Sequence, residues 1–237
     1  PVRITPAPTP SVNASTDRTV TIAGGTSSQF VSALLMTGVC LPGGLTVKVT
    51  GEVASPSYIR MTLWLLARFG AWVQSSDDLH VLRVRGAGKN ASGLASFRYD
   101  VEPDASGATY FLGAAALLPG VMCRVLGLSH ASVQGDAKFA SLLARMGAMT
   151  QHELGTSAGP AGDAFISVTG PTSNDLEPVL ADMSDMPDAA MTLASVACFA
   201  RGVSILRGLG TLRVKETDRI EAMRAELIKT GVHIENP

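Results

Sequence analysis

Leu65-Leu-Ala-Arg-Phe-Gly-Ala71 and Leu142-Leu-Ala-Arg-Met-Gly-Ala148 are almost identical, and Glu226-Leu-Ile-Lys-Thr-Gly-Val232 repeats their pattern. Each stretch ends an amphipathic run at a glycine, the residue that most readily takes the left-handed conformation that closes a helix. Such a match within one chain is hard to obtain by chance. The sequence therefore predicts a structural repeat, present in three copies.

The same order of elements precedes each of these helix ends. A helix that is apolar nearly all round comes first, and a short β-branched strand follows it. The expected helices are 28–36, 105–118 and 188–200, and the expected strands are 45–50, 121–126 and 203–207. A helix that is apolar on every side has to be buried on every side, whereas the alternating strand at 80–85 has one wet face. The predicted class is therefore α/β, with helices inside and sheets outside.

The composition excludes several classes of protein. Of the 237 residues, 46% are hydrophobic and 16% charged, which is too apolar for a disordered chain. The formal net charge of -1 offers no broad basic field, so a nucleic-acid partner is not expected. The most apolar stretch, 110–125, is broken by Pro119-Gly120 and is shorter than a membrane span, so no membrane association is expected.

Cysteine and histidine usage gives further expectations. Cys40, Cys123 and Cys198 are odd in number and widely spaced, and each lies in an apolar stretch. We therefore expect buried free thiols and a reducing compartment, the cytoplasm. The four histidines show no ligand spacing, so no metal site is expected.

The densest charge in the chain is Arg213-Val-Lys-Glu-Thr-Asp-Arg219, at the start of the last helix. Lys215 and Arg219 are four residues apart, on one helical face, where like charges repel each other. An anion bound between them would reverse that cost. The alternative is a solvated face on which Glu216 pairs with Arg219.

Polar residues stand at the starts of the apolar helices. The run Gly24-Gly-Thr-Ser-Ser-Gln29 exposes free backbone N–H groups, which suit a phosphate, although a plain serine N-cap is the alternative. Asp104 and Asp188 open the other two helices as simple N-caps or, for Asp188, as a general base. The hydroxyls of Ser55 and Tyr58 precede another helix. If the repeats pack as units, these helix starts converge on one cleft.

Five stretches of the chain resemble the motifs of EPSP synthases, in the order and with the spacing of that family. They are Ser27-Ser-Gln-Phe-Val-Ser-Ala-Leu-Leu-Met36, Asp104-Ala-Ser-Gly-Ala-Thr-Tyr-Phe-Leu112, Gln134-Gly-Asp136, Pro187-Asp-Ala-Ala-Met-Thr192 and Arg213-Val-Lys-Glu-Thr-Asp-Arg-Ile-Glu-Ala-Met223. The resemblance extends over nearly the whole chain, and the motifs together are highly specific.

The resemblance implies transfer of the carboxyvinyl group of phosphoenolpyruvate to the 5-hydroxyl of shikimate 3-phosphate, with release of inorganic phosphate. It implies addition to a tetrahedral intermediate followed by elimination, without a metal or organic cofactor. By this likeness Asp188 takes the proton of the 5-hydroxyl. Lys215 contacts both substrates and shuttles a proton, and Glu216 is another group for proton transfer.

The resemblance also implies a set of polar and cationic substrate-binding residues. They are Ser27, Ser28, Gln29, Ser55, Tyr58, Thr211 and Arg219. The three serines are implied to hold the phosphate of shikimate 3-phosphate, Gln29 and Tyr58 to line its ring site, and Arg219 to bind phosphoenolpyruvate. Two positions depart from the family. Thr211 stands where Asn or Ser is usual, and Ser55-Pro56-Ser57-Tyr58 replaces a Ser-x-Pro-Tyr pattern, so the local contacts are expected to differ.

The family fold has two inverse α/β barrel-like domains of three βαβαββ units each, with the active site between them. By likeness, residues 1–102 end the shikimate phosphate domain and residues 103–237 begin the second, so about three of six units are expected. Pro1 and an unturned strand at 232–235 indicate a fragment whose partner is the missing remainder of its own polypeptide. Family segments that bind phosphoenolpyruvate are missing too, so we expect the fragment alone to be inactive.

Two alternatives remain open from the sequence. The sister enzyme that transfers the same group to UDP-N-acetylglucosamine shares the fold, but its motifs differ at 27–29 and 213–219. A non-catalytic anion-binding relative would keep Ser27, Ser28 and Gln29 and tolerate the loss of Asp188 and Lys215. Both of these residues are present, which argues against that alternative.

Overall fold

The computed structural model describes residues 18–86, 94, 96, 98–154, 163–173 and 175–236. The chain divides into two compact units. The first unit consists of Pro1–Gly24, Gln29–Val53 and Thr62–Phe97. The second unit consists of Gly25–Ser28, Ala54–Met61 and Arg98–Pro237.

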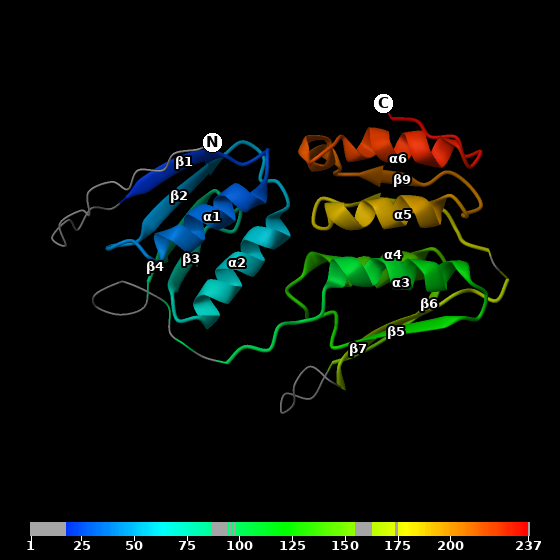
Figure 1. Cartoon of the computed structure of the whole chain (residues 1–237), viewed down its shortest axis with the longest axis horizontal. Helices are drawn as coiled ribbons and strands as arrows, with labels where there is room; N and C mark the ends of the chain where they lie inside the picture. The colour runs from blue at the N-terminus through cyan, green and yellow to red at the C-terminus, as the bar shows by residue number, and fades with distance from the viewer. Residues whose placement is uncertain are drawn as a thin grey trace, which may run out of the picture. The chain divides into compact units, whose positions relative to one another are not determined.

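The first unit is a four-stranded sheet with helices on one of its faces (Figure 1). The strand order is β1 (Thr19–Ala23), β2 (Leu45–Thr50), β4 (Val81–Arg85) and β3 (Trp72–Ser75). β1 runs parallel to β2, and the other neighbouring strands are antiparallel. Helix α1 (Ser28–Gly38) packs on the sheet beside the part of α2 (Pro56–Arg68) that follows Met61, and the hydroxyls of Ser32 and Thr62 contact each other at 2.8 Å. The start of α2, up to Met61, belongs to the second unit.

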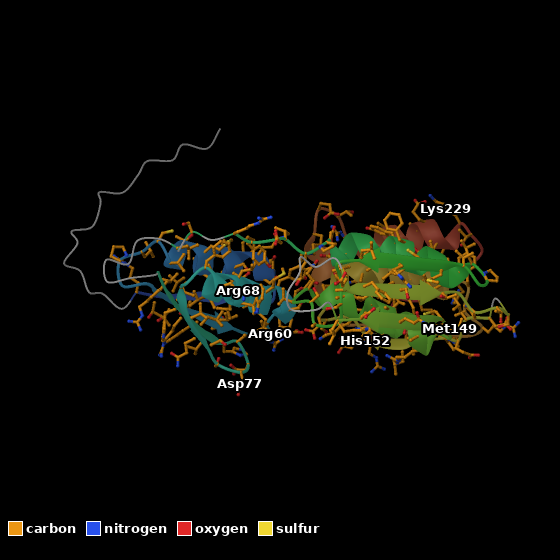
Figure 2. All side chains as sticks on the ribbon, turned by 90° about the horizontal axis from the view of Figure 1, so that it is seen from below. Arg60, Arg68, Asp77, Met149, His152 and Lys229 are labelled. Carbon is orange, nitrogen blue, oxygen red and sulfur yellow. The ribbon has the colours of Figure 1, made fainter. Side chains whose placement is uncertain are left out.

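Helix α2 shows the amphipathic pattern that the sequence predicts. Ile59, Leu63 and Leu66 recur at helical spacing and are buried. Arg60 and Arg68 lie on the exposed face of the same helix (Figure 2). Burial of one stripe therefore decides which side of α2 faces the core.

The second unit has an antiparallel sheet in the order β5 (Met122–Leu126), β7 (Phe165–Thr169) and β6 (Met149–Glu153). Helices α3 (Ala105–Leu117) and α4 (Phe139–Arg145) pack on this sheet, and α5 (Ala190–Ala197) packs on α3. The parallel pair of β8 (Leu180–Asp182) and β9 (Ile205–Arg207) lies beyond α5 (Figure 1). Helices α3, α4 and α5 therefore lie between two sheets, as expected (Figure 1).

Close packing of α3 against α5 forms the centre of the second core. A Cβ at Gly113 on α3 would come within 2.9 Å of Cγ2 of Thr192 on α5. The Thr109 and Thr192 hydroxyls contact each other at 3.1 Å across the same interface. Leu112 and Leu193 are buried beside them. The two helices approach this closely because the side chains at their contact are small.

The expected helix at 188–200 is shorter and less regular than predicted. It opens with one 3-10 turn, η3 (Pro187–Ala189), and the α-helical part is α5. Such turns are common at helix starts, and Pro187 has no N–H to donate.

The expected strand at 232–235 is wrong, because the structure assigns no strand there. A strand is held by bonds to a neighbouring strand, and no described strand pairs with this segment.

Two expectations about burial also need correction. Helix α3 is not buried on every side, since Tyr110 and Phe111 are 61% and 66% exposed. Its small residues face α5 and the sheet, and the described elements cover only that part of the cylinder. Cys40 is exposed and Cys123 and Cys198 are half-buried, so an apolar sequence context did not bury these thiols.

Gly113→Val should lower the free energy of unfolding by about 1–3 kcal/mol, the usual cost of forcing extra carbon into a packed interface. Urea denaturation measures this change. Ala114→Val is the matched control, because it adds the same branched side chain on the exposed side of α3. We expect the control to change stability by no more than about 0.5 kcal/mol. Equal losses in the two variants would contradict the close α3–α5 contact.

Candidate active site

Asp188 lies at the centre of the charged groups that the sequence singles out. It is the middle residue of η3, directly before α5. Its hydrogen bonds and ion pairs with described residues go to Arg219, Lys215 and Tyr58. Three other predicted site residues therefore meet at the carboxylate of Asp188.

Two cations share one oxygen of this carboxylate. Arg219 Nη1 donates to Asp188 Oδ1 at 2.9 Å, and Lys215 Nζ lies 3.6 Å from the same oxygen. The three side chains are only 21–28% exposed, so their attraction is stronger than it would be in water. Lys215 and Arg219 thus share a carboxylate of the chain itself, and a bound anion between them stays a prediction.

Glu216 also pairs with Arg219. Its two carboxylate oxygens accept hydrogen bonds from Nε and Nη2 of Arg219 at 2.8 and 2.9 Å, in the bidentate geometry that suits a guanidinium. The hydrogen bond from Arg219 lowers the pKa of Glu216, and the pair raises the pKa of Arg219. The Glu216–Arg219 pair, which the sequence offers as one alternative, is therefore present, and the binding of a ligand anion between Lys215 and Arg219 stays a prediction.

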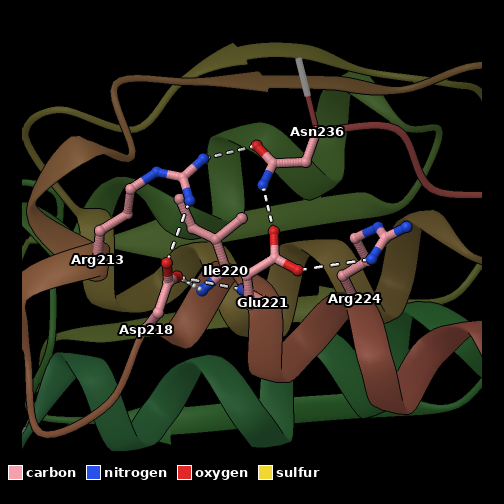
Figure 3. A network of polar contacts seen from close by, with 6 residues as sticks. All are labelled: Arg213, Asp218, Ile220, Glu221, Arg224 and Asn236. Atoms are coloured by element: carbon pink, nitrogen blue, oxygen red, sulfur yellow. Dashed lines mark hydrogen bonds and ion pairs between the residues drawn. The ribbon is translucent and has the colours of Figure 1, made fainter.

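A polar network fixes the start of α6 (Arg219–Ile228), the helix that carries Arg219. Asp218 caps it by accepting from the backbone N–H groups of Ile220 and Glu221, at 3.1 Å each (Figure 3). Arg213 donates to Asp218 at 3.1 Å and to Asn236 at 2.8 Å, and Asn236 donates to Glu221 at 2.7 Å. A capped and cross-linked first turn holds the Arg219 side chain in a set direction.

Tyr58 reaches Asp188 from the first turn of α2. Its hydroxyl donates to Asp188 Oδ2 at 3.3 Å, on the oxygen that the two cations leave open. Burial raises the pKa of Tyr58, and the negative charges of Asp136 and Asp188 raise it further, so the phenol keeps its proton. The neighbouring Ser57 hydroxyl donates to the Asp185 carbonyl at 2.6 Å, which ties the start of α2 to the loop before η3.

Asp136 and Ser106 were not singled out as site residues by the sequence analysis. Asp136 lies on the 3-10 turn η1 (Gly135–Lys138), is 5% exposed, and accepts a hydrogen bond from the Ser106 hydroxyl. Together with Tyr58 they line one cavity of about 40 Å³. Burial raises the pKa of Asp136. The sequence did contain a signal for Asp136. It is the acidic residue of Gln134-Gly-Asp136, a motif that we used only to identify the resemblance.

The remaining predicted residues lie at their expected element starts. Ser28 begins α1 and Ser55 precedes α2, and both are buried. Ser27 and Gln29 flank Ser28 in the chain. These four residues are not among the described partners of Asp188. Their common role toward a phosphate stays a prediction.

Thr211 lies on the 3-10 turn η4 (Gly210–Val214), just before Lys215. Its Oγ1 is shielded from solvent and has no hydrogen-bond partner among the described residues. A buried hydroxyl without a partner is costly, so it is suited to a polar ligand group. This supports its place in the predicted set.

The N-cap alternative holds for one acid and fails for the other. Asp104 caps α3 by accepting from the Ser106 backbone N–H at 2.9 Å. Asp188 is not at an N-cap position, since Met186 precedes η3 and Ala189 precedes α5, and the described hydrogen bonds of its carboxylate go to Tyr58 and Arg219. Asp188 is therefore not explained as a cap.

A profile of the family described as EPSP synthase (3-phosphoshikimate 1-carboxyvinyltransferase) matches residues 5–237. The chain belongs to the EPSP synthase family. Among curated relatives, the 3-phosphoshikimate 1-carboxyvinyltransferase of Cronobacter sakazakii is 41% identical, over 91% of this chain and 46% of that protein. The same enzyme of Burkholderia lata is 42% identical, over 99% of this chain and 51% of that protein. The chain thus spans about half the length of the curated EPSP synthases it matches.

Solved structures of the EPSP synthase fold resemble the chain as well. EPSP synthase from Acinetobacter baumannii matches with a TM-score of 0.66 at 23% identity, over 89% of this chain and 45% of that chain. The enolpyruvyl transferase NikO from Streptomyces tendae matches with a TM-score of 0.56 at 19% identity, over 80% and 44%. The predicted α/β fold of inverse barrel-like domains is thereby confirmed. In the described part of the chain, no helix is long and apolar enough to cross a membrane.

Arg219→Gln should raise the pKa of Glu216 toward its ordinary value, because the hydrogen bond from Arg219 is the main cause of its lowering. NMR titration of the glutamate carboxyl carbons measures this. Arg201→Gln is the matched control. It removes a guanidinium that pairs with Asp175 and has no part in the network at the start of α6, so it should leave the pKa of Glu216 unchanged. A Glu216 titration that does not respond to loss of Arg219 would contradict the bidentate pair.

Proposed function

We propose that the protein containing this chain transfers the carboxyvinyl group of phosphoenolpyruvate to the 5-hydroxyl of shikimate 3-phosphate and releases inorganic phosphate. The observation that carries the proposal is the Asp188 carboxylate, held between Lys215 and Arg219 in a chain of the EPSP synthase family. The reaction joins two anionic substrates, and fixed cations offset their repulsion. A positioned carboxylate and a positioned ammonium are the acid–base groups that it requires.

In the addition step, Asp188 takes the proton of the 5-hydroxyl as the hydroxyl oxygen bonds to C2 of phosphoenolpyruvate. Lys215 delivers a proton to the C3 methylene, which becomes a methyl group in the tetrahedral intermediate. In the elimination step, the methyl group gives up a proton and the bond from C2 to the phosphate oxygen breaks. Glu216 suits the role of accepting that proton, because its carboxylate lies beside Arg219, the guanidinium that also contacts Asp188.

The binding roles follow the same proposal. Ser27, Ser28 and Ser55 hold the phosphate of shikimate 3-phosphate, and Gln29 and Tyr58 line the ring site. The burial of Ser28 and Ser55 supports this, because a ligand contacted by buried hydroxyls is shielded from competing water.

Two further binding roles complete the proposed site. Thr211 offers shikimate 3-phosphate a hydroxyl that has no partner among the described residues. Arg219 binds phosphoenolpyruvate, whose anion competes with Glu216 for the guanidinium. The reaction uses no metal or organic cofactor, and residues outside this chain supply the rest of the phosphoenolpyruvate site.

The proposed setting is the cytoplasm. Cys40, Cys123 and Cys198 are all free thiols, which suits a reducing compartment. Small-molecule substrates, with no nucleic acid or membrane, are the proposed partners.

Asp188→Asn in the full-length protein should lower kcat by about a hundredfold or more, the usual scale for loss of a general base. The amide keeps the shape of the carboxylate but cannot accept the proton, so shikimate 3-phosphate should still bind. Phosphate release measures the rate and calorimetry the binding. Asp182→Asn is the control, since Asp182 only caps a local turn at Ser184. Near-normal turnover of Asp188→Asn would refute its role as the base.

Lys215→Met should lower both kcat and the affinity for phosphoenolpyruvate, because one ammonium serves binding and proton transfer. Methionine keeps much of the stem and removes the charge. Lys229→Met is the matched control, because Lys229 is the exposed residue that follows the last turn of α6 and pairs with Glu226 (Figure 2). If Lys215→Met changed only stability, the cation would be a structural surface group.

Measuring turnover with UDP-N-acetylglucosamine as acceptor separates the sister reaction, and no turnover with either acceptor would favour a non-catalytic relative.

A further inference from the structure

The segment 213–218, which leads from η4 into α6, carries Lys215 and Glu216 but is not fixed by packing. Leu212 before it is buried, whereas none of its own residues is, and α6 has no buried residue either. Among the described backbone hydrogen bonds outside helices and strands, none is made by residues 215–217. Side-chain contacts therefore have to set the direction in which Lys215 and Glu216 point.

One set of these contacts joins groups of the candidate site to each other. Lys215 Nζ lies 3.6 Å from Asp188, and Glu216 accepts from Arg219 at 2.8 and 2.9 Å. Under the proposed function, substrates engage the same groups, and an anion that binds Arg219 competes with Glu216. These contacts therefore rearrange during turnover, and they cannot by themselves keep the shape of the segment while substrates are bound.

Arg213 makes a second set of contacts, which does not involve the groups proposed to bind substrate. Its Nη1 donates to Asp218 Oδ2 at 3.1 Å, so the two ends of the segment 213–218 are joined (Figure 3). Its Nη2 donates to Asn236 Oδ1 at 2.8 Å, and Asn236 donates to Glu221 Oε1 at 2.7 Å. The guanidinium thus connects both ends of the segment with the first turn of α6.

The carboxylate of Asp218 uses its two oxygens for separate tasks. Oδ1 accepts from the backbone N–H groups of Ile220 and Glu221 and caps α6, while Oδ2 faces Arg213. The pKa of Asp218 is lowered, first by the hydrogen bond from the Glu221 N–H and further by Arg213, so this acid is ionised at neutral pH. The cap and the ion pair are therefore present together, on opposite oxygens of one group.

We propose that Arg213 is a positioning residue for Lys215 and Glu216. By pairing with Asp218 across the segment, it keeps these two groups directed at the site while substrates replace their resting contacts. The side chains of Arg213 and Asp218 are 42% and 35% exposed, so the pair contributes little to the stability of the fold. A small misplacement of a reacting group, in contrast, is costly in rate. The inference rests on the proposed roles of Lys215 and Glu216.

Arg213→Gln in the full-length protein tests the proposal, because glutamine is shorter and uncharged. Its kcat, measured by phosphate release, should fall by about tenfold, the scale of a modest misplacement of reacting groups. Calorimetry should show shikimate 3-phosphate bound with unchanged affinity and stoichiometry, because its proposed phosphate and ring contacts come from the starts of α1 and α2. The midpoint of urea denaturation should stay nearly unchanged, as expected for a partly exposed pair.

Two further variants make the test specific. Asp218→Asn keeps the cap, since asparagine caps helices as well as aspartate does, but its amide nitrogen then faces Arg213 with donors only. It should lower kcat by about tenfold as well, and the double variant should lose no more than either single one, because both break one contact. Arg224→Gln is the matched control and should keep kcat within about twofold. Arg224 is also 42% exposed and belongs to the same network through Glu221, but it does not pair with the segment.

Several outcomes would overturn the inference. A near-normal kcat in Arg213→Gln would show that the pair does not position the site. A fall in kcat matched by an equal fall in the bound fraction of shikimate 3-phosphate, or unfolding of both Arg213→Gln and Asp218→Asn, would assign the pair to folding alone. An equal loss in Arg224→Gln would assign the effect to surface charge. Absence of turnover in the unmodified protein would instead refute the proposed function, which keeps the two failures distinct.

Discussion

The arrangement of the candidate site depends on the Asp188 carboxylate. Lys215 and Arg219 both lie within ion-pair distance of its Oδ1, and without that charge the two cations would repel each other in a partly buried setting. Removing one partner from such a group leaves uncompensated charge, which usually costs more than the pair itself stabilises. The carboxylate therefore keeps both cations directed toward one point before any ligand binds.

This pairing also determines how an anion can enter the site. Arg219 is already engaged by Asp188 and Glu216, so an incoming anion has to replace one of them. Glu216 is 66% exposed and returns easily to water, whereas Asp188 is also held by Tyr58 and Lys215. Exchange at Glu216 is the less costly of the two, and it leaves the Asp188 cluster intact.

Helix packing connects the core of the second unit to this chemistry. The close contact at Gly113 and Thr192 sets the distance between α3 and α5. Ser106 lies in the first turn of α3 and Asp188 in the turn that leads into α5, so this packing also sets the separation of the two polar groups. Tyr58 hydrogen-bonds to Asp188 and lines one cavity with Ser106. A change of volume within the core is therefore expected to reach the carboxylate through backbone position rather than through direct contact.

The sequence by itself determined the repeat, most of the helices and strands, the family, and the motif from Arg213 to Arg219. These depend on local periodicity, on glycines after helices and on residue order, all of which one stretch of chain contains. The tertiary structure alone decided that Asp188 lies between Lys215 and Arg219, that it is not the N-cap of its helix, and that buried Asp136 lines one cavity with Ser106 and Tyr58. It also decided that 232–235 is not a strand in the described chain. Such features depend on partners about thirty residues or more away, and no local pattern specifies which distant groups packing will bring together.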